Sequence, residues 1–500
     1  MDYETFNLKS KGGRVAQYAS IRTNYNLQIL KESAKNYYCL QTLDNLPSPK
    51  AALVTQITPQ KIVRIQSGIE KSELLKKNIE PKVFNEYWFI THVLDEMAVP
   101  KTCTLGYNSF KFDDEFTRNL LYRNLYDPYA REWQNNNSRF DVYFLVLATY
   151  VLNPSILTFP PVVENGVIQY HSITGKELPN FRLEELSKSN GISHTNAHDA
   201  FSDVEATIGL MKKIKEANEY FFEEIFAFRK KNHVGEWLYK NDKKPFIHIS
   251  PFYGKENYCF AVLYPLYSIQ NSMICLNLAI DIEPLIELEG DDLLGYLFPH
   301  NSLQNKNVVV FYLNQCPILA NVSEYSEQLK TFNLDKSRMA KNLNLIKTHS
   351  DRIVNRLKPH YPKEFSSNSN SVDTDLGIYS SGFFNDLEKD CMVEFHLAIK
   401  NGLIPHGFSK LKSHRLKEMG LKVIARNFPE QLSEDQKSWW MSYARNKIQN
   451  KDFGAEYTLE EFNHEIADLL GSNIPNNSKL VLLELMDYVK SIKTKLRIFE

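Results

Sequence analysis

The length and charge of the chain limit what it can be. Its 500 residues exceed what one hydrophobic core normally serves, and domains of about 100–200 residues predict roughly three. Lys and Arg total 59 against 60 for Asp and Glu, giving a net charge of −1. The chain therefore has no overall basic character, and any nucleic-acid-binding surface must be local.

The cysteines and apolar runs argue against several protein classes. Six scattered cysteines include no CxxC pair, so neither a zinc knuckle nor a dithiol redox site is indicated. The polar N-terminal segment is no signal peptide, and the longest apolar run, Val142–Leu152, is shorter than the ~18 residues of a membrane span. We therefore expect a cytoplasmic protein that does not bind membranes. We also expect a monomer.

Strand-like and helical patterns alternate from residue 1 to about 215. Val15–Arg22 alternates apolar and polar residues as a half-buried strand does, and Lys101–Asn108 is typical of a strand that ends in a turn. Asp114–Tyr126 and Val204–Ile214 carry apolar residues at helical spacing. This mixture predicts an α/β or α+β domain.

The pattern changes to short β-rich runs between about 220 and 365. We expect a small barrel or compact sheet there, with helices over Ser326–Lys358. The predicted strands lie within Pro245–Pro251, Tyr258–Ser268, Met273–Asp281 and Val308–Leu313.

The C-terminal part reads as a linker followed by helices. Residues 366–375 are polar and rich in Ser and Asn, whereas Phe383–Glu500 is mainly helical in pattern. For example, Leu482, Leu485, Met486 and Val489 fall at i, i+3, i+4 and i+7, on one face of a predicted helix.

The residues that carry chemistry begin with an Asp-x-Glu pair. Asp2 and Glu4 are two apart, so on a strand both side chains point to one face and offer oxygen ligands to a hard divalent cation. Taken alone, the pair is ordinary for a solvated strand end. A second carboxylate, Asp113, lies where a strand-turn gives way to a helix and alone would be read as a helix cap.

A histidine and a further aspartate complete the pattern. His198 and Asp203 form a His-x4-Asp spacing where a loop leads into an amphipathic helix. Each short motif is common, but all of them in this order within ~200 residues are not expected by accident. Four converging carboxylates would repel one another unless cations were bound between them.

The ordered set resembles the DnaQ-like exonucleases of the DEDDh type. Further segments narrow the resemblance to the exodeoxyribonuclease I family, and they extend over the whole chain. These segments are Gly106–Trp133, Phe181–Leu186, Gly191–Thr207, Asn314–Ala320, Ser381–Phe384 and Ala425–Pro429.

The resemblance implies a fold and a domain order. The expected architecture is an α/β (α+β) multidomain chain: an RNase H-like exonuclease domain over 1–217, an SH3-like β-barrel domain over 218–365, a linker over 366–375 and a helical domain over 376–500. It implies a positively charged channel for single-stranded DNA.

The family also implies catalytic roles. Asp2, Glu4 and Asp203 match its metal ligands, Asp113 matches the fourth acid, and His198 matches the general base. The implied cofactor is Mg²⁺, two ions per site, with Mn²⁺ able to substitute. The implied activity is 3′→5′ hydrolysis of single-stranded DNA that releases deoxynucleoside 5′-monophosphates, in DNA repair and recombination.

Several positions match substrate contacts of the family. Arg182 matches an arginine that grips the DNA, and Glu4 also matches a contact to the terminal nucleotide. The remaining positions that match the DNA path are Arg118, Tyr129, Trp133 and Lys231. Arginine and lysine pair with phosphates, and aromatic rings stack on unpaired bases whatever their sequence.

A basic stretch in the C-terminal part has two interpretations. It could follow a phosphate backbone or simply be a solvated helix face. Its members are Lys410, Lys412, Arg415, Lys417, Lys422 and Arg426.

Two departures from the family leave alternatives open. The given sequence begins at Met1-Asp2 and lacks the strand that normally leads into the first catalytic acid, so either translation begins upstream or Asp2 lies at a frayed terminus and binds metal weakly. Asn153 replaces a basic residue that helps bind the C-terminal tail of single-stranded DNA-binding protein, which weakens the prediction of that partner. The rival functions are an RNA-preferring DEDDh exoribonuclease, tested by matched DNA and RNA oligomers, and a catalytically impaired single-strand-binding protein.

Overall fold

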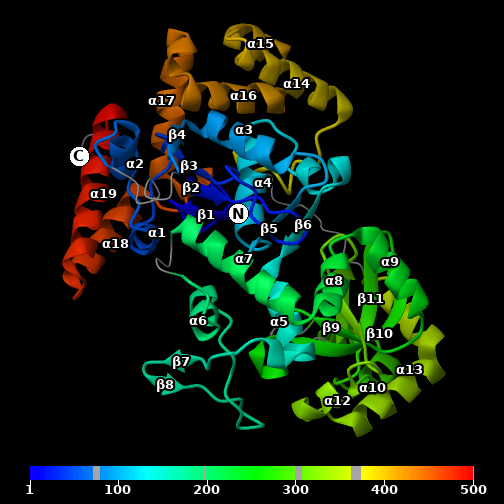
Figure 1. Cartoon of the computed structure of the whole chain (residues 1–500). Helices are drawn as coiled ribbons and strands as arrows, with labels where there is room; N and C mark the ends of the chain where they lie inside the picture. Colours follow the sequence, from blue (N-terminus) through cyan, green and yellow to red (C-terminus); the bar gives the residue numbers. More distant parts are fainter. Residues whose placement is uncertain (71–78, 195–198, 299–306, 362–372, 499–500) are drawn as a thin grey trace. The chain divides into compact units, whose positions relative to one another are not determined.

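The computed structural model describes residues 1–70, 79–194, 199–298, 307–361 and 373–498 (Figure 1). The chain forms two compact units. The first comprises Met1–Ser138, Thr195–Glu205 and Ser367–Glu500, and the second comprises Arg139–His194 and Ala206–Ser366. Strand β6 (Ser138–Asp141) and helix α7 (Ala200–Ala217) each pass from one unit to the other.

The first unit is built on a four-stranded sheet of order β1-β2-β3-β4, in which only the β3–β4 pair is parallel. Aromatic residues of the strands, such as Tyr3 and Tyr18, pack with Phe89 and Phe116 in one core. The elements of this N-terminal part are β1 (Asp2–Thr5), β2 (Val15–Ser20), β3 (Lys35–Cys39), α1 (Pro49–Thr55), α2 (Pro59–Gln66), β4 (Lys82–Phe84), α3 (Glu86–Met97), β5 (Cys103–Gly106) and α4 (Asp113–Arg123).

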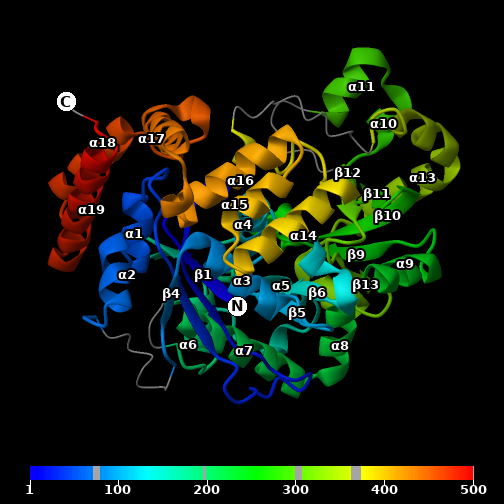
Figure 2. The ribbon, with the colours of Figure 1, turned by 90° about the horizontal axis from the view of Figure 1, so that it is seen from above.

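The C-terminal helices belong to the same unit and share a core with it. Leu46, Tyr87 and Leu125 pack in one cluster with Phe395 and Leu482. Figures 1 and 2 show α18 and α19, in red, beside α1 and α2, in blue. These helices are α14 (Asp386–Lys400), α15 (Ile404–Lys410), α16 (His414–Asn427), α17 (Glu434–Gln449), α18 (Leu459–Gly471) and α19 (Asn476–Lys495).

The second unit contains an antiparallel five-stranded sheet of order β12-β11-β10-β9-β13. Its strands are β9 (Phe246–Ile249), β10 (Phe260–Ile269), β11 (Ser272–Asn277), β12 (Val308–Tyr312) and β13 (Ile318–Asn321). A small hairpin and helices complete the unit: α5 (Val142–Leu152), β7 (Val163–Glu164), β8 (Val167–Ile168), α6 (Leu183–Ser189), α8 (Glu219–Ala227), α9 (Lys231–Lys240), α10 (Glu283–Glu287), α11 (Gly290–Leu297), α12 (Ser326–Leu329) and α13 (Lys336–Leu357).

Most predicted elements are confirmed with shifted ends. The strand predicted over Val15–Arg22 ends at Ser20, and the helix predicted from Asp114 begins one residue earlier. On the helix face that carries Leu482, Leu485, Met486 and Val489, Met486 is 42% exposed and the other three residues are buried. None of the helices in the described ranges is both long and apolar enough to cross a bilayer.

Candidate active site

Three carboxylates converge where β1 meets the start of α7. Asp2 and Glu4 lie on β1, where they pair with Ala19 and Gln17 of β2, and their spacing brings both side chains to one face. Asp203 lies in the first turn of α7. One carboxylate oxygen from each of the three acids lies within 4.8 Å of those of the other two.

A fourth acid is tied to the same strand. Asp113 begins α4 and is buried, and its Oδ1 accepts a hydrogen bond of 3.0 Å from the backbone N–H of Tyr3. The Tyr3 hydroxyl in turn accepts a hydrogen bond from Thr117 one turn along α4. The four predicted acids are therefore brought together, although Asp113 is fixed by the backbone of β1 rather than grouped with the other three.

Burial, and after it the charges of neighbouring acids, raise the pKa values of Asp2, Glu4 and Asp113. Burial, followed by the charges of Asp113, Glu4 and Asp203, raises the pKa of Asp2 well above its ordinary value. Burial and then the charge of Asp203 do the same to the pKa of Glu4. Burial is also the main reason that the pKa of Asp113 rises to about 8.

These features fit a divalent cation. Hard cations prefer carboxylate oxygens, and a cation among Asp2, Glu4 and Asp203 would offset the repulsion that helps to raise the pKa of Asp2 and of Glu4. Asp2 lies within a paired strand, and the Met1 ammonium donates to the backbone oxygen of Leu105 at 2.9 Å. The predicted general base, His198, lies outside the described residues.

One acid near the site was missed by the sequence analysis. The Asp199 carboxylate accepts hydrogen bonds from the backbone N–H groups of Phe201 and Ser202, as an N-cap residue does. Its charge also raises the pKa of Glu4, after burial and the charges of Asp203 and Asp113. Its place directly before a helical pattern could have identified Asp199 from the sequence as a helix N-cap.

The predicted DNA contacts are divided between the two units. Arg118, Tyr129 and Trp133 lie in the first unit, where the Arg118 guanidinium lies 5.4 Å from the centre of the Tyr129 ring. Arg182 and Lys231 belong to the second unit and are exposed.

An exposed aromatic residue that sequence reasoning did not single out lies beside Tyr129. Phe383 is 82% exposed, and its ring meets that of Tyr129 edge-on at 5.6 Å. The next residue, Phe384, is buried and stacks on Tyr122, which fixes the segment to α4. The motif Ser381–Phe384 was part of the resemblance, but its spacing alone gives no sign of which ring is exposed.

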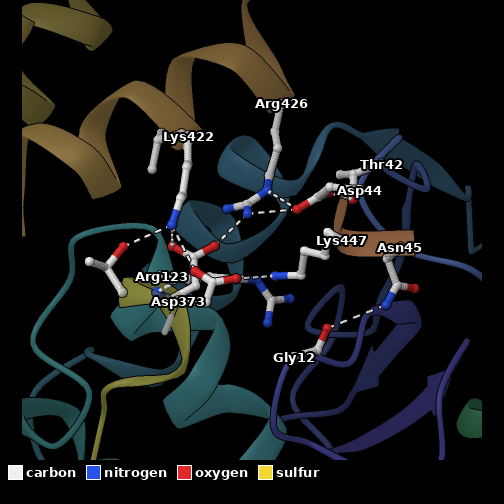
Figure 3. Close-up of polar contacts among 12 residues, drawn as sticks. Gly12, Thr42, Asp44, Asn45, Arg123, Asp373, Lys422, Arg426 and Lys447 are labelled. Carbon is white, nitrogen blue, oxygen red and sulfur yellow. Dashed lines mark hydrogen bonds and ion pairs between the residues drawn. The ribbon is translucent and has the colours of Figure 1, made fainter. Parts of the chain in front are cut away.

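The basic stretch runs from the end of α15 through α16, and neither of its two interpretations holds for all of its members. Lys422 and Arg426 are fully buried and point inward to acids (Figure 3). Lys422 Nζ lies 2.7 Å from Asp373 Oδ1, and Arg426 Nη2 lies 2.7 Å from Asp44 Oδ2. These two residues are therefore not free to meet a phosphate backbone.

Comparison with protein families agrees with this architecture. Residues 229–363 match the exonuclease I SH3-like domain, and residues 372–492 match the exonuclease I C-terminal domain. Among curated proteins, exodeoxyribonuclease I of Buchnera aphidicola from Schizaphis graminum is 35% identical over 446 residues, which cover 88% of this chain and 85% of that protein. Exodeoxyribonuclease I of Escherichia coli is 31% identical over 500 residues, covering 98% and 97%.

Solved structures give the same result. Exonuclease I from Methylocaldum szegediense has a TM-score of 0.82 at 30% identity, with 98% of each chain covered. The zinc-bound form of the E. coli exonuclease I complex with single-stranded DNA has a TM-score of 0.80 at 30% identity, and an ExoI/SSB-Ct complex has 0.79 at 29%, each covering 98% of both chains. The predicted fold class is thereby confirmed. The chain belongs to the exodeoxyribonuclease I family, as the segments that resemble this family over the whole sequence indicated.

Proposed function

We propose that this protein is a single-strand-specific 3′→5′ exodeoxyribonuclease that releases deoxynucleoside 5′-monophosphates, in DNA repair and recombination. The observation that carries the proposal is the meeting of Asp2, Glu4 and Asp203 within 4.8 Å, beside the buried Asp113. Membership of the exodeoxyribonuclease I family supports the substrate and the polarity.

The proposed cofactor is Mg²⁺, two ions per site, with Mn²⁺ able to substitute. Asp2, Glu4 and Asp203 would hold the ions, with Asp113 as the fourth acid. When bound, two such cations stabilise the charge that develops on the attacking and leaving oxygens of a phosphodiester.

The protein side chains have distinct proposed roles. His198 takes a proton from the attacking water, because the pKa of an unperturbed histidine suits that task near neutral pH. Asp113 keeps its orientation through the Tyr3 N–H, so its position depends on the same strand that carries Asp2 and Glu4. Glu4 also meets the terminal nucleotide.

The proposed DNA path uses rings for bases and cations for phosphates. Tyr129, Trp133 and Phe383 present exposed or half-exposed rings, which stack on unpaired bases of any sequence. Arg118, Arg182 and Lys231 supply the phosphate contacts, as the family resemblance implies.

The proposed partners and organisation follow the family. Single-stranded DNA is the substrate, and the tail of single-stranded DNA-binding protein is a second partner, although Asn153 supplies no positive charge to it. The protein is proposed to act as a monomer in the cytoplasm, a reducing compartment that suits six cysteines which form no disulfide with one another. The boundaries at 217, 365 and 375 stay predictions.

Digestion of end-labelled oligonucleotides tests the function as a whole. Single- and double-stranded DNA and a matched RNA, each with Mg²⁺ or EDTA, report strandedness, sugar preference, polarity and metal dependence together. We expect stepwise shortening of single-stranded DNA from its 3′ end, only with the metal. Cleavage within the strand, or preferential digestion of the RNA, would refute the proposal.

His198→Ala is expected to lower turnover by ~10²–10⁴-fold, the usual contribution of a positioned general base. The affinity for single-stranded DNA in EDTA should change little, because the residue is proposed to act on water rather than to hold the strand. Single-turnover rates and equilibrium binding measure the two quantities separately. Turnover near the unmodified level would remove His198 from the mechanism.

A further inference from the structure

Arg118, one of the proposed phosphate contacts, is already held by two carboxylates. Its Nε and Nη2 donate to Glu132 Oε1 and Oε2 at 2.7 and 2.9 Å, and its Nη1 donates to Glu115 Oε1 at 2.7 Å. The pair with Glu132 is bidentate, and both side chains are only 12–13% exposed. Three of the five N–H groups of this guanidinium are therefore occupied within the protein.

Glu132 lies within the proposed DNA path. It ends a 3₁₀ turn over Ala130–Glu132, which Tyr129 and Trp133 flank in the sequence. The preceding residue, Arg131, is buried and donates to Asp114 Oδ1 at 2.6 Å, which ties the turn to the start of α4. The ion pair between Glu132 and Arg118 is thus fixed among the side chains proposed to meet the strand.

The carboxylate of Glu132 and a DNA phosphate compete for the same part of Arg118. A carboxylate and a phosphate both accept two parallel hydrogen bonds from one arginine fork, so the same edge of Arg118 cannot bind both at once. Arg118 with Glu115 and Glu132 also carries a net negative charge, which repels a phosphate. A phosphate can take the bidentate position only after Glu132 leaves it.

We propose that Glu132 sets the affinity for single-stranded DNA by competing with its phosphate for Arg118. The proposal rests on the proposed function. Glu132 weakens binding at this position, and it replaces the phosphate on Arg118 each time the strand moves on. The guanidinium therefore never has to be left without a partner as the strand advances, which lowers the energetic barrier to stepping.

Binding measurements on the full chain test this proposal. Fluorescence anisotropy with a labelled dT oligomer in EDTA reports affinity without hydrolysis. We expect Glu132→Gln to bind roughly tenfold more tightly, the value of one charge-assisted pair. The dependence of log K on log salt should also steepen by about 0.7, since one more phosphate of a single strand is neutralised.

Two controls separate competition from a general charge effect. Glu434→Gln makes the same charge change at a surface residue that is 89% exposed, and it should bind as the unmodified protein does. In an Arg118→Gln background, Glu132→Gln should raise the affinity for the oligomer no more than that control does, because the guanidinium for which Glu132 and phosphate compete has been removed. Thermal melts of each variant check that the fold is retained.

The outcomes distinguish a failure of this proposal from a failure of the proposed function on which it rests. Equal or weaker binding by Glu132→Gln, with normal binding by the unmodified protein, would show that Glu132 orients Arg118 instead, and would overturn the inference alone. A gain that survives in the Arg118→Gln background would also overturn it. Failure of the unmodified protein to bind the oligomer would overturn both this inference and the proposed function.

Discussion

Asp203→Asn is expected to abolish Mg²⁺-dependent hydrolysis, lowering turnover by about 10³-fold or more, because metal-assisted stabilisation of a transition state is worth several kcal/mol. The substitution keeps the shape of the side chain and removes one of the three carboxylate charges that lie within 4.8 Å of one another. Single-turnover digestion of a labelled single strand at saturating Mg²⁺ measures the loss.

The same variant has a signature that a purely structural residue would not give. In the metal-free protein, the charge of Asp203 raises the pKa of both Asp2 and Glu4, so its removal relieves repulsion. We therefore expect the melting temperature in EDTA to stay the same or rise. The increase in melting temperature that Mg²⁺ produces by binding the folded state should disappear.

A neighbouring aspartate provides the matched control. Asp199→Asn removes a charge four residues away, and Asn caps a helix as well as Asp does, so α7 should keep its start. That variant should retain most of the activity and the Mg²⁺-induced rise in melting temperature. Retained hydrolysis in Asp203→Asn at saturating Mg²⁺ would contradict its assignment as a ligand.

The sequence identified the acids of this site through their order and not through their geometry. Alternation places Asp2 and Glu4 on one face of a strand, but no local pattern says that the N–H between them binds Asp113, more than 100 residues later. Only the resemblance to a family supplied that long-range information. The structure adds Asp199, whose capping role is local and could have been predicted.

Charged residues were the hardest to interpret from sequence. Lys422 and Arg426 follow other basic residues, which suggests a solvated or phosphate-binding face, yet their partners Asp373 and Asp44 lie 49 and 382 residues away. Arg118 was expected from the resemblance to line the DNA path, which stays a prediction, and its pairing with Glu132 depends on how a 3₁₀ turn folds back on α4. Periodicity predicts which side of a helix is buried and does not predict which charge will neutralise another.

Asp44→Asn is expected to destabilise the fold by about 3 kcal/mol, the lower end of the cost of breaking a buried ion pair from one side. Asp44 is fully buried, and its Oδ2 lies 2.7 Å from Arg426 Nη2 (Figure 3). The same Oδ2 lies 2.9 Å from Arg14 Nη2. Asparagine would leave these two arginines with Glu86 and Asp375 as their remaining acidic partners. Denaturant unfolding at pH 7 measures the loss. The control is Asp468→Asn, at an ion-paired side chain that is 69% exposed, and its free energy of unfolding is expected to stay within about 0.5 kcal/mol of the unmodified value.

The buried cluster also predicts how stability depends on pH. Burial opposes the charge of Asp44, but Arg14 and Arg426 hold the pKa of its carboxyl well below the ordinary value. Burial likewise opposes the charge of Glu86, and Arg123 and Arg14 lower its pKa to about 2. A carboxyl with a depressed pKa stabilises the folded state above its ordinary pKa, near 4, and that contribution is lost as the pH falls toward the folded-state value.

The free energy of unfolding should therefore fall steeply below about pH 4 in the unmodified protein and less steeply in Asp44→Asn, which has already lost one such group. Since Arg426 belongs to α16 and Asp44 to the N-terminal part of the same unit, acid should loosen the C-terminal helices from that part. Limited proteolysis across this pH range follows that loosening directly. An Asp44→Asn variant with unchanged stability and unchanged acid sensitivity would show that these buried charges do not hold the two parts together.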